Sequence, residues 1–132
     1  MATLSPDQRK IFQDQNFVAV ATVGRDGTPR NTIVWVDVDG DDVLVNGAES
    51  RAWIKNLKHN PNVALTIFDH EQPYRRVSVI GKAVQITTDG AEDHIDKLSM
   101  KYGGRPYPNH LPNDPRVLVR IRPSKITAMG VR

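Results

Sequence analysis

The chain has 132 residues, a length that suits one domain with a sizeable hydrophobic core and is too short for two such domains. The net charge is only +3, with basic residues spread along the sequence, which argues against a dedicated nucleic-acid binder and is compatible with small anionic partners. With no cysteine, the sequence excludes disulfides, cysteine-ligated zinc sites and thiol catalysis.

The N-terminal residues lack the apolar run of a signal peptide, and no stretch has the length and apolarity of a membrane span. We therefore expect a cytoplasmic protein without a membrane partner. Ser5 and Pro6 supply the cap and the early proline of a short helix. Three predicted strands follow as a meander, joined by a turn at Asp26-Gly27 and by an acidic turn. These strands cover residues 17–23, 32–38 and 43–47.

The second half of the chain contains two further predicted helices and three further strands. A short helix begins at Ser50, and a longer one over residues 89–103 ends at Gly103. Gly81 lies inside a long predicted strand and indicates a bend or bulge there. The strands of this half cover residues 63–69, 75–87 and 116–123.

Six strands against three short helices indicate a mainly β fold of the α+β kind, built as one domain over residues 1–132. The strands do not alternate with helices, which argues against a parallel nucleotide-binding sheet. A six-stranded antiparallel barrel with short flanking helices fits this order better. Such a small barrel is filled by its own side chains, so its function is expected at a surface groove or an interface.

Metal and hydrolytic sites are not indicated. The four histidines show no HxH or HExxH spacing, and the acidic stretch at residues 37–42 has its glycine too early for a calcium loop. We therefore interpret that stretch as a hairpin turn and expect no metal. No G-x-S-x-G motif or recognisable Ser/His/Asp grouping is present, which argues against a hydrolase.

The helix that begins near Ser50 has an unusual distribution of charge. Arg51, Lys55 and Lys58 recur at helical spacing, although cations are disfavoured at the positive end of a helix. Trp53 occupies the third position after the Ser50 cap, where a capping box would have Glu. The cations form either a solvated stripe or an anion site shared by the helix start, the Ser50 hydroxyl and the Arg51 fork.

Three other features are candidates for a site. Trp35 follows the strand alternation less strictly than its neighbours, so it faces a flat ligand, an interface or the core. Tyr74, Arg75 and Arg76 lie at the start of a strand, where alternation sends the two arginines to opposite faces. The loop after the last helix contains four prolines and two tyrosines within residues 102–115, and such stiff long loops often close over a site.

The order of these pieces resembles a known family. The most specific stretch is "SRAWIKNLKHNPNVAL", and the turn "DGTPR", the strand segment "GKAV" and the closing strand "RIRPSKITAMG" add weight. Over nearly the whole chain, the sequence resembles the pyridoxamine 5'-phosphate oxidase-like split β-barrels, and among them the flavin- or deazaflavin-dependent oxidoreductases of actinobacterial type.

The resemblance implies a homodimer with cofactor sites in the clefts between protomers and hydride transfer to or from a small organic molecule. It places the cofactor ring along one strand, the phosphate at a helix start, and a third group of contacts on a later strand or across the dimer. The implied cofactor-binding residues are Val34, Trp35, Val36, Asp37, Ser50, Arg51, Ala52, Trp53, Lys55, Asn56, Tyr74, Arg75 and Arg76. The implied cofactor is the deazaflavin coenzyme F-420, with FMN as the alternative.

One departure from the family pattern bears on the cofactor. Several F-420-binding relatives have a lysine where this chain has Trp53, so Arg51 and Lys55 would have to supply that charge. The chain also lacks the further basic and C-terminal motifs of the vitamin B6 oxidases. No acid or base stands out among the side chains. Tyr102, Tyr107 and His110 are the candidates in the loop.

Two other hypotheses remain open from the sequence. The same fold could serve as a non-catalytic carrier for F-420 or a flavin. A barrel that binds single-stranded nucleic acid would need stacking aromatics along a basic groove, and aromatic residues make up only 6% of the chain.

Overall fold

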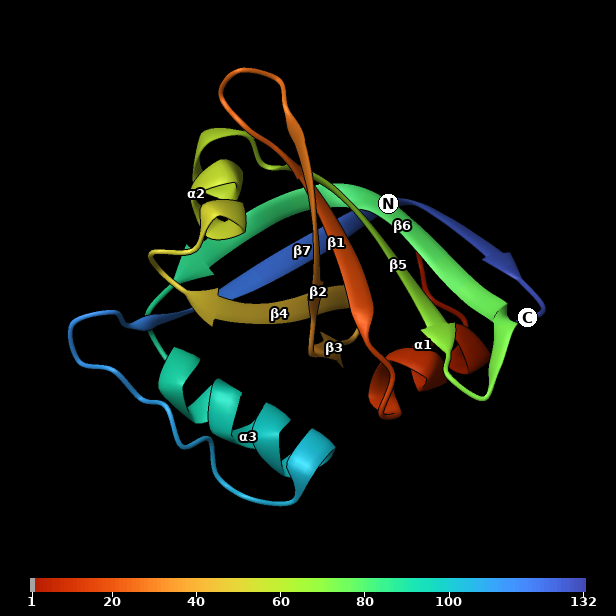
Figure 1. Ribbon diagram of the computed structural model, residues 1–132. Helices are drawn as coiled ribbons and strands as arrows, with labels where there is room; N and C mark the ends of the chain where they lie inside the picture. Colours follow the sequence, from red (N-terminus) through yellow and green to blue (C-terminus); the bar gives the residue numbers. More distant parts are fainter. Residues whose placement is uncertain (1) are drawn as a thin grey trace.

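The computed structural model describes residues 2–132, which form one antiparallel sheet of seven strands and three helices (Figure 1). The helices are α1 (Pro6–Gln13), α2 (Ala52–His59) and α3 (Ala91–Gly103). The strands are β1 (Val18–Val23), β2 (Pro29–Val34), β3 (Val36–Asp39), β4 (Asp42–Ala48), β5 (Asn62–Asp69), β6 (Gln72–Thr87) and β7 (Arg116–Met129). No helix in this part of the chain has both the length and the apolarity needed to cross a membrane.

The sheet curls around a single hydrophobic core. Its strand order is β2-β1-β5-β6-β7-β4-β3, with every neighbouring pair antiparallel. Phe12 from α1, Ile54 and Leu57 from α2, and Ile67 and Ile121 from the strands are almost completely buried inside it. The predicted mainly β barrel is therefore confirmed, with β2 and β3 as the two edges of a split (Figure 1).

The strand count differs from the expected six because the strand predicted at residues 32–38 is two strands. The break falls at Trp35: β2 ends at Val34 and pairs with β1, whereas β3 begins at Val36 and pairs with β4. Side chains of α3 satisfy the backbone at this break. The hydroxyl of Tyr102 accepts a hydrogen bond from the Val36 N–H at 3.3 Å, and Lys101 Nζ donates to the Val36 carbonyl at 2.8 Å.

Other local predictions are confirmed or shifted by a few residues. Ser5 caps α1 and forms a capping box with Gln8. At Gly81 the β6–β7 register shifts, and a Cβ there would collide with the Arg122 carbonyl. Helix α3 ends at Gly103 as predicted, and Gly104, with a φ of 72°, is its C-cap. The closing strand β7 runs on to Met129 because it pairs with β6 along its length.

The start of α2 corrects a prediction. Its N-cap is Arg51, without a side-chain cap, and Ser50 lies one residue outside the helix. The Ser50 hydroxyl instead donates to the Asp114 carboxylate at 2.6 Å, and the Ser50 N–H donates to the same group at 3.1 Å. These bonds hold the pKa of Asp114 below its usual value. Ser50 thus ties α2 to the loop before β7 and does not cap the helix.

Candidate functional site

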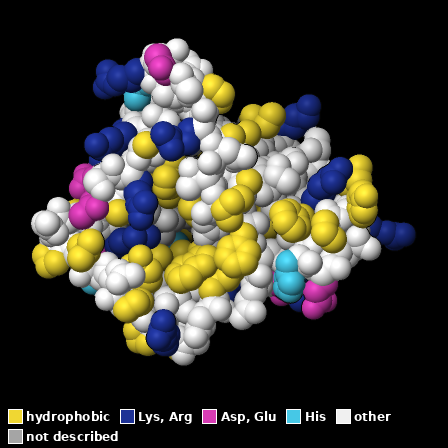
Figure 2. Space-filling view, viewed as in Figure 1, with side chains coloured by type: hydrophobic (Ala, Val, Ile, Leu, Met, Phe, Trp, Pro, Cys, Tyr) yellow, Lys and Arg dark blue, Asp and Glu magenta, His cyan; other side chains and the backbone are white. Residues whose placement is uncertain are grey.

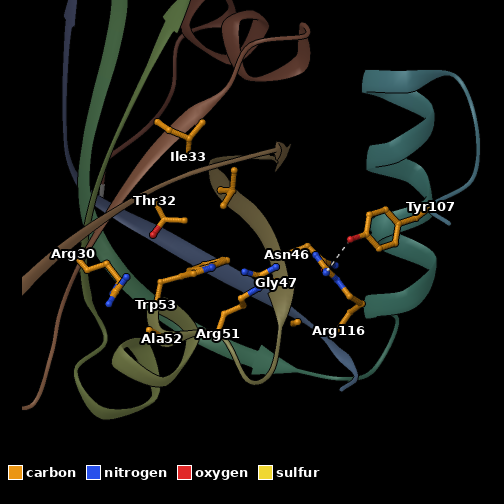
Figure 3. A pocket seen from close by; sticks show the side chains of 12 residues that line it. Arg30, Thr32, Ile33, Asn46, Gly47, Arg51, Ala52, Trp53, Tyr107 and Arg116 are labelled. Atoms are coloured by element: carbon orange, nitrogen blue, oxygen red, sulfur yellow. Dashed lines mark hydrogen bonds between the residues drawn. The ribbon is translucent and has the colours of Figure 1, made fainter. Parts of the chain in front are cut away.

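The split in the barrel leaves two strand edges facing one groove. The pairing of β3 with β4 reaches only as far as Val45, so Asn46 to Ala48 pair with β7 on one side alone within the described chain. On the opposite wall, β2 pairs only with β1. A cavity of about 440 Å³ lies here, and we call it the cationic groove (Figure 3). Unpaired strand edges offer backbone N–H and C=O groups to a ligand.

Gly47 sets how closely the start of α2 approaches this groove. A Cβ on Gly47 would lie 2.5 Å from Cζ2 of Trp53 and 3.2 Å from Ile54, so only glycine allows this approach of helix and strand. Trp53 is 4% exposed and packs into the core, with one edge lining the groove. This packing places Arg51, at the first turn of α2, on the rim of the groove (Figure 3).

Three arginines from three elements line the cationic groove. Arg30 comes from β2, Arg51 from the start of α2, and Arg116 from the start of β7 (Figure 3). None of the residues that line it is an acid. Across residues 2–132, the side chains of Arg30 and Arg51 take part in no hydrogen bond or ion pair. Guanidinium groups bind phosphate and carboxylate through paired N–H donors, so the groove is suited to an anion.

Arg116 is held more firmly than the other two arginines. Its Nε donates to Asn46 Oδ1 at 2.9 Å, and its Nη1 lies 3.4 Å from the hydroxyl of Tyr107, whose ring it also faces at 5.0 Å. Burial lowers the pKa of Arg116, and the nearby charge of Arg51 adds to this effect, whereas Tyr107, Glu92 and Asp114 oppose it. The guanidinium is therefore fixed in place by neutral partners.

The cavity continues into a second, more apolar space of about 300 Å³, which we call the apolar groove. It shares Tyr107 and Arg116 with the cationic groove and adds Phe17, Trp35 and Ile95. Hydrophobic side chains gather on this face of the molecule beside Lys and Arg (Figure 2). The two grooves thus form one site with a charged end and an apolar end.

Trp35 forms one wall of the apolar groove. Its ring stacks on Tyr102 with centroids 5.2 Å apart and planes 7° apart, and Tyr102 also stacks against Phe17. The ring of Tyr107 meets Trp35 edge-on at 6.3 Å. Of the alternatives left open by the sequence, the structure therefore places Trp35 beside a cavity, with an aromatic stack behind it.

Five of the predicted cofactor-binding residues line the two grooves, whereas two of their neighbours, Val36 and Asp37, do not. Those that line the grooves are Val34, Trp35, Arg51, Ala52 and Trp53. Val36 is fully buried, with its backbone bonded to α3. Burial alone would raise the pKa of Asp37, but His94 Nε2 at 3.6 Å, the Val38 N–H and Lys97 Nζ at 3.1 Å hold it far below its usual value.

Two more predicted residues lie on another side of α2. Lys55 and Asn56 line an adjoining cavity of about 530 Å³ beside the β1–β2 turn, which shares Arg30 and Ala52 with the cationic groove. Asn56 Nδ2 donates to Thr22 Oγ1 at 3.1 Å and so joins α2 to β1. Lys58, the third cation of the predicted stripe, pairs with Glu49 at 2.9 Å. Only Arg51 of the stripe lines the cationic groove.

The group Tyr74, Arg75 and Arg76 lies at the opposite end of the sheet. This part of β6 pairs with the C-terminal end of β7, whereas Arg116 begins β7 at the groove. Arg75 Nη1 bonds Asp69 at 3.0 Å, and Tyr74 is 71% exposed. Within one chain these residues do not reach the groove. Their predicted role would require a second copy.

The candidate acids and bases fall into different environments. Burial raises the pKa of Tyr102 to about 12, and its hydroxyl donates to the Asn16 carbonyl at 2.5 Å, so it serves the fold. His110 bridges Glu92 and Asp96 of α3 outside the two grooves, and these bonds raise its pKa. Tyr107 alone of the three lines the grooves.

The residues of the site that sequence reasoning missed include three with polar contacts or charge, Arg30, Asn46 and Arg116. Arg30 is the last residue of the "DGTPR" turn, so the signal was present but unassigned. Arg116 and Asn46 could not be found from spacing because they meet at 2.9 Å across 70 residues.

Comparisons with known proteins agree with this architecture. The family described as pyridoxamine 5'-phosphate oxidase matches residues 4–130. A solved structure named F-420 reductase is 29% identical, with a TM-score of 0.79 over 90% of this chain and 94% of the other. A search of curated protein sequences finds no match.

Two more distant structures show the fold alone. General stress protein 26 from Bacillus anthracis is 22% identical, with a TM-score of 0.71 over 93% of this chain and 91% of its own. A conserved hypothetical protein from Mycobacterium tuberculosis is also 22% identical, with a TM-score of 0.70 over 98% and 88% of the two chains.

Proposed function

The chain belongs to the pyridoxamine 5'-phosphate oxidase family of flavin-type oxidoreductases, and on this premise we propose that it binds the deazaflavin coenzyme F-420. With that cofactor it transfers hydride to or from a small organic molecule. The observation that carries the proposal is the convergence of Arg30, Arg51 and Arg116 on one groove without a lining acid. The similarity to the structure named F-420 reductase supports this choice of cofactor.

The residues present fit a phosphate-bearing flat cofactor. Arg51 and Arg30 would hold the phosphate at the start of α2, where the helix dipole adds to their charge. The open edge of β2 near Val34 would receive hydrogen bonds from, or donate them to, the polar edge of the ring. When bound, the deazaflavin supplies the hydride chemistry, and the chain supplies position and electrostatics.

The proposal includes a homodimer. Tyr74, Arg75 and Arg76 can contribute to a site only if a second copy covers the groove. Several apolar side chains of β6 and β7 are exposed for such contact, among them Ile80 at 55% and Met129 at 49%. Sedimentation velocity at micromolar concentration should give a mass twice that of the 14.8 kDa chain, and a monomer would contradict this part of the proposal.

Arg51→Ala tests the cofactor assignment. We expect this change to weaken F-420 binding at least tenfold, because a charge-assisted contact is lost, and to leave the melting temperature of the cofactor-free protein nearly unchanged. Lys58→Ala is the matched control, since Lys58 lies on the same helix but pairs with Glu49. Equilibrium titration followed by the absorbance of the cofactor measures both variants.

Titration with FMN under the same conditions distinguishes the two cofactors. Tighter binding of F-420 than of FMN by the wild-type protein supports the proposal, and the reverse order would assign the site to FMN. Binding of neither at micromolar concentration would contradict the function. If Arg51→Ala lowers the melting temperature and leaves affinity unchanged, Arg51 has a structural role instead.

A further inference from the structure

We propose that Arg116 selects the substrate: the apolar groove takes flat, mainly apolar molecules that carry a carboxylate, and Arg116 binds that carboxylate. The inference rests on the proposed function, because it assigns the substrate end of the same site. It goes beyond that function by naming a substrate class and the residue that recognises it.

The apolar groove has the composition expected for such a ligand. Its walls include the rings of Phe17, Trp35 and Tyr107, and Arg116 is the only charged residue among those that line it in the described chain. The volume of about 300 Å³ lies at the lower end of the range for small-molecule sites. A single cation in an otherwise apolar cavity favours a ligand with one negative group attached to a hydrophobic body.

In residues 2–132 the guanidinium of Arg116 forms no hydrogen bond or ion pair with an acid, although the charges of Glu92 and Asp114 act on it from further away. The hydrogen-bond partners of that group are the Asn46 amide and the Tyr107 hydroxyl, both neutral. The acid nearest in the hydrogen-bond network, Glu92, accepts from the backbone N–H of Arg116 at 2.7 Å and not from its side chain. A half-buried guanidinium of this kind gains most from a bound anion.

The network behind Arg116 fixes its orientation before any ligand arrives. Asn46 Nδ2 donates to the Ala91 carbonyl at 2.9 Å and lies 3.2 Å from His94 Nδ1, so both ends of the Asn46 amide are engaged. The side chains of Asn46 and His94 are buried, at 5% and 8% exposure. Positions held by buried partners lose little entropy on binding, and this favours a specific contact.

The position of Arg116 separates its role from those of the other two arginines. Neither Arg30 nor Arg51 lines the apolar groove: Arg51 lines the cationic groove, and Arg30 lines that groove and the cavity beside the β1–β2 turn. Arg116 lines both the cationic and the apolar groove at their junction. In Figure 3, Arg51 lies between Arg30 and Arg116. A phosphate held by Arg30 and Arg51 therefore leaves Arg116 for a second anion. Arg51 and Arg116 repel each other in the free protein, and two bound anions would relieve that repulsion.

The test compares a carboxylate with its neutral isostere. Naphthalene-2-carboxylate and naphthalene-2-carboxamide have the same flat body, and their binding can be followed through tryptophan fluorescence, since both tryptophans of the chain line the grooves. We expect the wild-type protein to bind the carboxylate at least tenfold more tightly than the carboxamide. Arg116→Gln should reduce that ratio to near one by weakening carboxylate binding only.

Arg51→Gln is the matched control at the other end of the site. It should keep most of the preference for carboxylate while losing affinity for F-420, because Arg51 lines the cationic groove and not the apolar groove. An unchanged carboxylate preference in Arg116→Gln would overturn the proposal. An equal loss of that preference in Arg116→Gln and Arg51→Gln would also overturn it. If Arg116→Gln does not fold, Arg116→Lys replaces it. Lysine keeps the charge but lacks the paired N–H donors of the guanidinium, so the ratio of carboxylate to carboxamide affinity should be intermediate. A wild-type ratio would contradict recognition by the guanidinium.

The two proposals fail separately in this experiment. The probes are first titrated into cofactor-free protein, so the carboxylate preference is measured whether or not F-420 binds. Absence of F-420 binding together with a preference that depends on Arg116 would contradict only the cofactor assignment. F-420 binding without any carboxylate preference in the wild-type protein would contradict only the role of Arg116.

Discussion

Two groups of arginines in this molecule differ in how their charge is balanced. Around the β3–β4 turn, Arg120 bonds Asp42 and Asp39 at 3.1 and 3.0 Å, and Arg122 bonds Asp42 at 3.3 Å. Nearby, Arg9 pairs with Asp41 at 3.1 Å. In the cationic groove, by contrast, Arg30, Arg51 and Arg116 line one cavity with no acid among the lining residues.

The presence or absence of a paired acid distinguishes arginines that stabilise the fold from arginines that are available to bind a ligand. Where an arginine joins strands, the chain supplies the carboxylate, and the acidic stretch that resembled a calcium loop is used in this way. Where the chain supplies none, like charges repel in the free protein, and a bound anion converts that repulsion into affinity. The comparison therefore predicts opposite effects of mutation at the two places.

The largest effect on stability is expected from Asp42→Asn. The Asp42 side chain is 15% exposed and accepts hydrogen bonds from both Arg120 and Arg122, so its neutralisation should lower the free energy of unfolding by about 1–2 kcal/mol. Urea denaturation measures this. F-420 affinity should stay within twofold of wild type, since the pair lies outside the grooves.

Glu49→Gln is the control for Asp42→Asn. It removes the exposed Glu49–Lys58 pair, and such pairs contribute only about 0–1 kcal/mol. Asp42→Asn could instead lower the free energy of unfolding no more than Glu49→Gln does. The paired arginines would then stabilise the fold no more than an ordinary surface pair, which would contradict their assigned structural role.

A smaller effect is expected when inorganic phosphate is added to the cofactor-free protein. For a dissociation constant of about 20 mM, 100 mM phosphate would stabilise the folded state by about 1 kcal/mol, since it binds only that state. For a chain of this length that corresponds to a rise of about 3 °C in melting temperature. The reference is chloride at equal ionic strength, measured by differential scanning fluorimetry.

Arg51→Ala isolates the part of this stabilisation that comes from the groove. Phosphate also stabilises proteins generally through exclusion from their surface, and that part should be equal in both proteins. We therefore expect the rise to be smaller in Arg51→Ala than in wild type and unchanged in Lys58→Ala. Equal rises in all three proteins would show that the unpaired arginines do not bind phosphate.

The fold was more predictable from the sequence than the site. Helix α1 and the Gly27 turn depend on neighbouring residues, so local patterns predicted them. The glycine at position 81 indicated the bulge, although the contact that requires it comes from Arg122 on β7. The break at Trp35 depends on α3, whose Lys101 and Tyr102 bind Val36 from 65 and 66 residues away. No local pattern in residues 32–38 contains that information.

The same distinction explains the site residues. The sequence pointed to Arg51 because its charge conflicts with the helix start. It could not exclude Lys55 and Lys58, because their directions depend on how α2 lies on β1 and where Glu49 falls. Arg116 carried no local conflict. The place of Arg116 in the site becomes clear only in the folded chain, where β4, β7 and the loop with Tyr107 meet.

The smallest expected effect concerns a third charge cluster, in which a histidine takes the place of arginine. His110 lies 2.6 Å from Glu92 and 2.8 Å from Asp96, and Asp96 also accepts the Tyr107 N–H at 2.9 Å. The cluster thus holds the loop that brings Tyr107 to the grooves. Unlike the arginines, His110 loses its positive charge when pH rises through its pKa.

The sign of its pH dependence follows from the shifts. The raised pKa of His110 means that its contribution is complete below the ordinary value of 6.5 and is lost as pH rises through the raised value. The lowered pKa values of Glu92 and Asp96 mean that theirs is complete above the ordinary 4.5 and 3.8. We therefore expect the loop to be held most firmly between about pH 4.5 and 6.5.

Amide exchange at Tyr107, compared between wild type and His110→Gln, measures this contribution. The protection factor of the wild-type amide should exceed that of the variant at pH 6. The difference should shrink as pH rises through the raised pKa of His110, because the imidazole then loses the charge that Glu92 and Asp96 attract. A difference that does not shrink with rising pH would mean that His110 holds the loop by packing or neutral hydrogen bonds. In that case the cluster would not depend on the charge of His110, and the contrast between paired and unpaired charges would rest on the arginines alone.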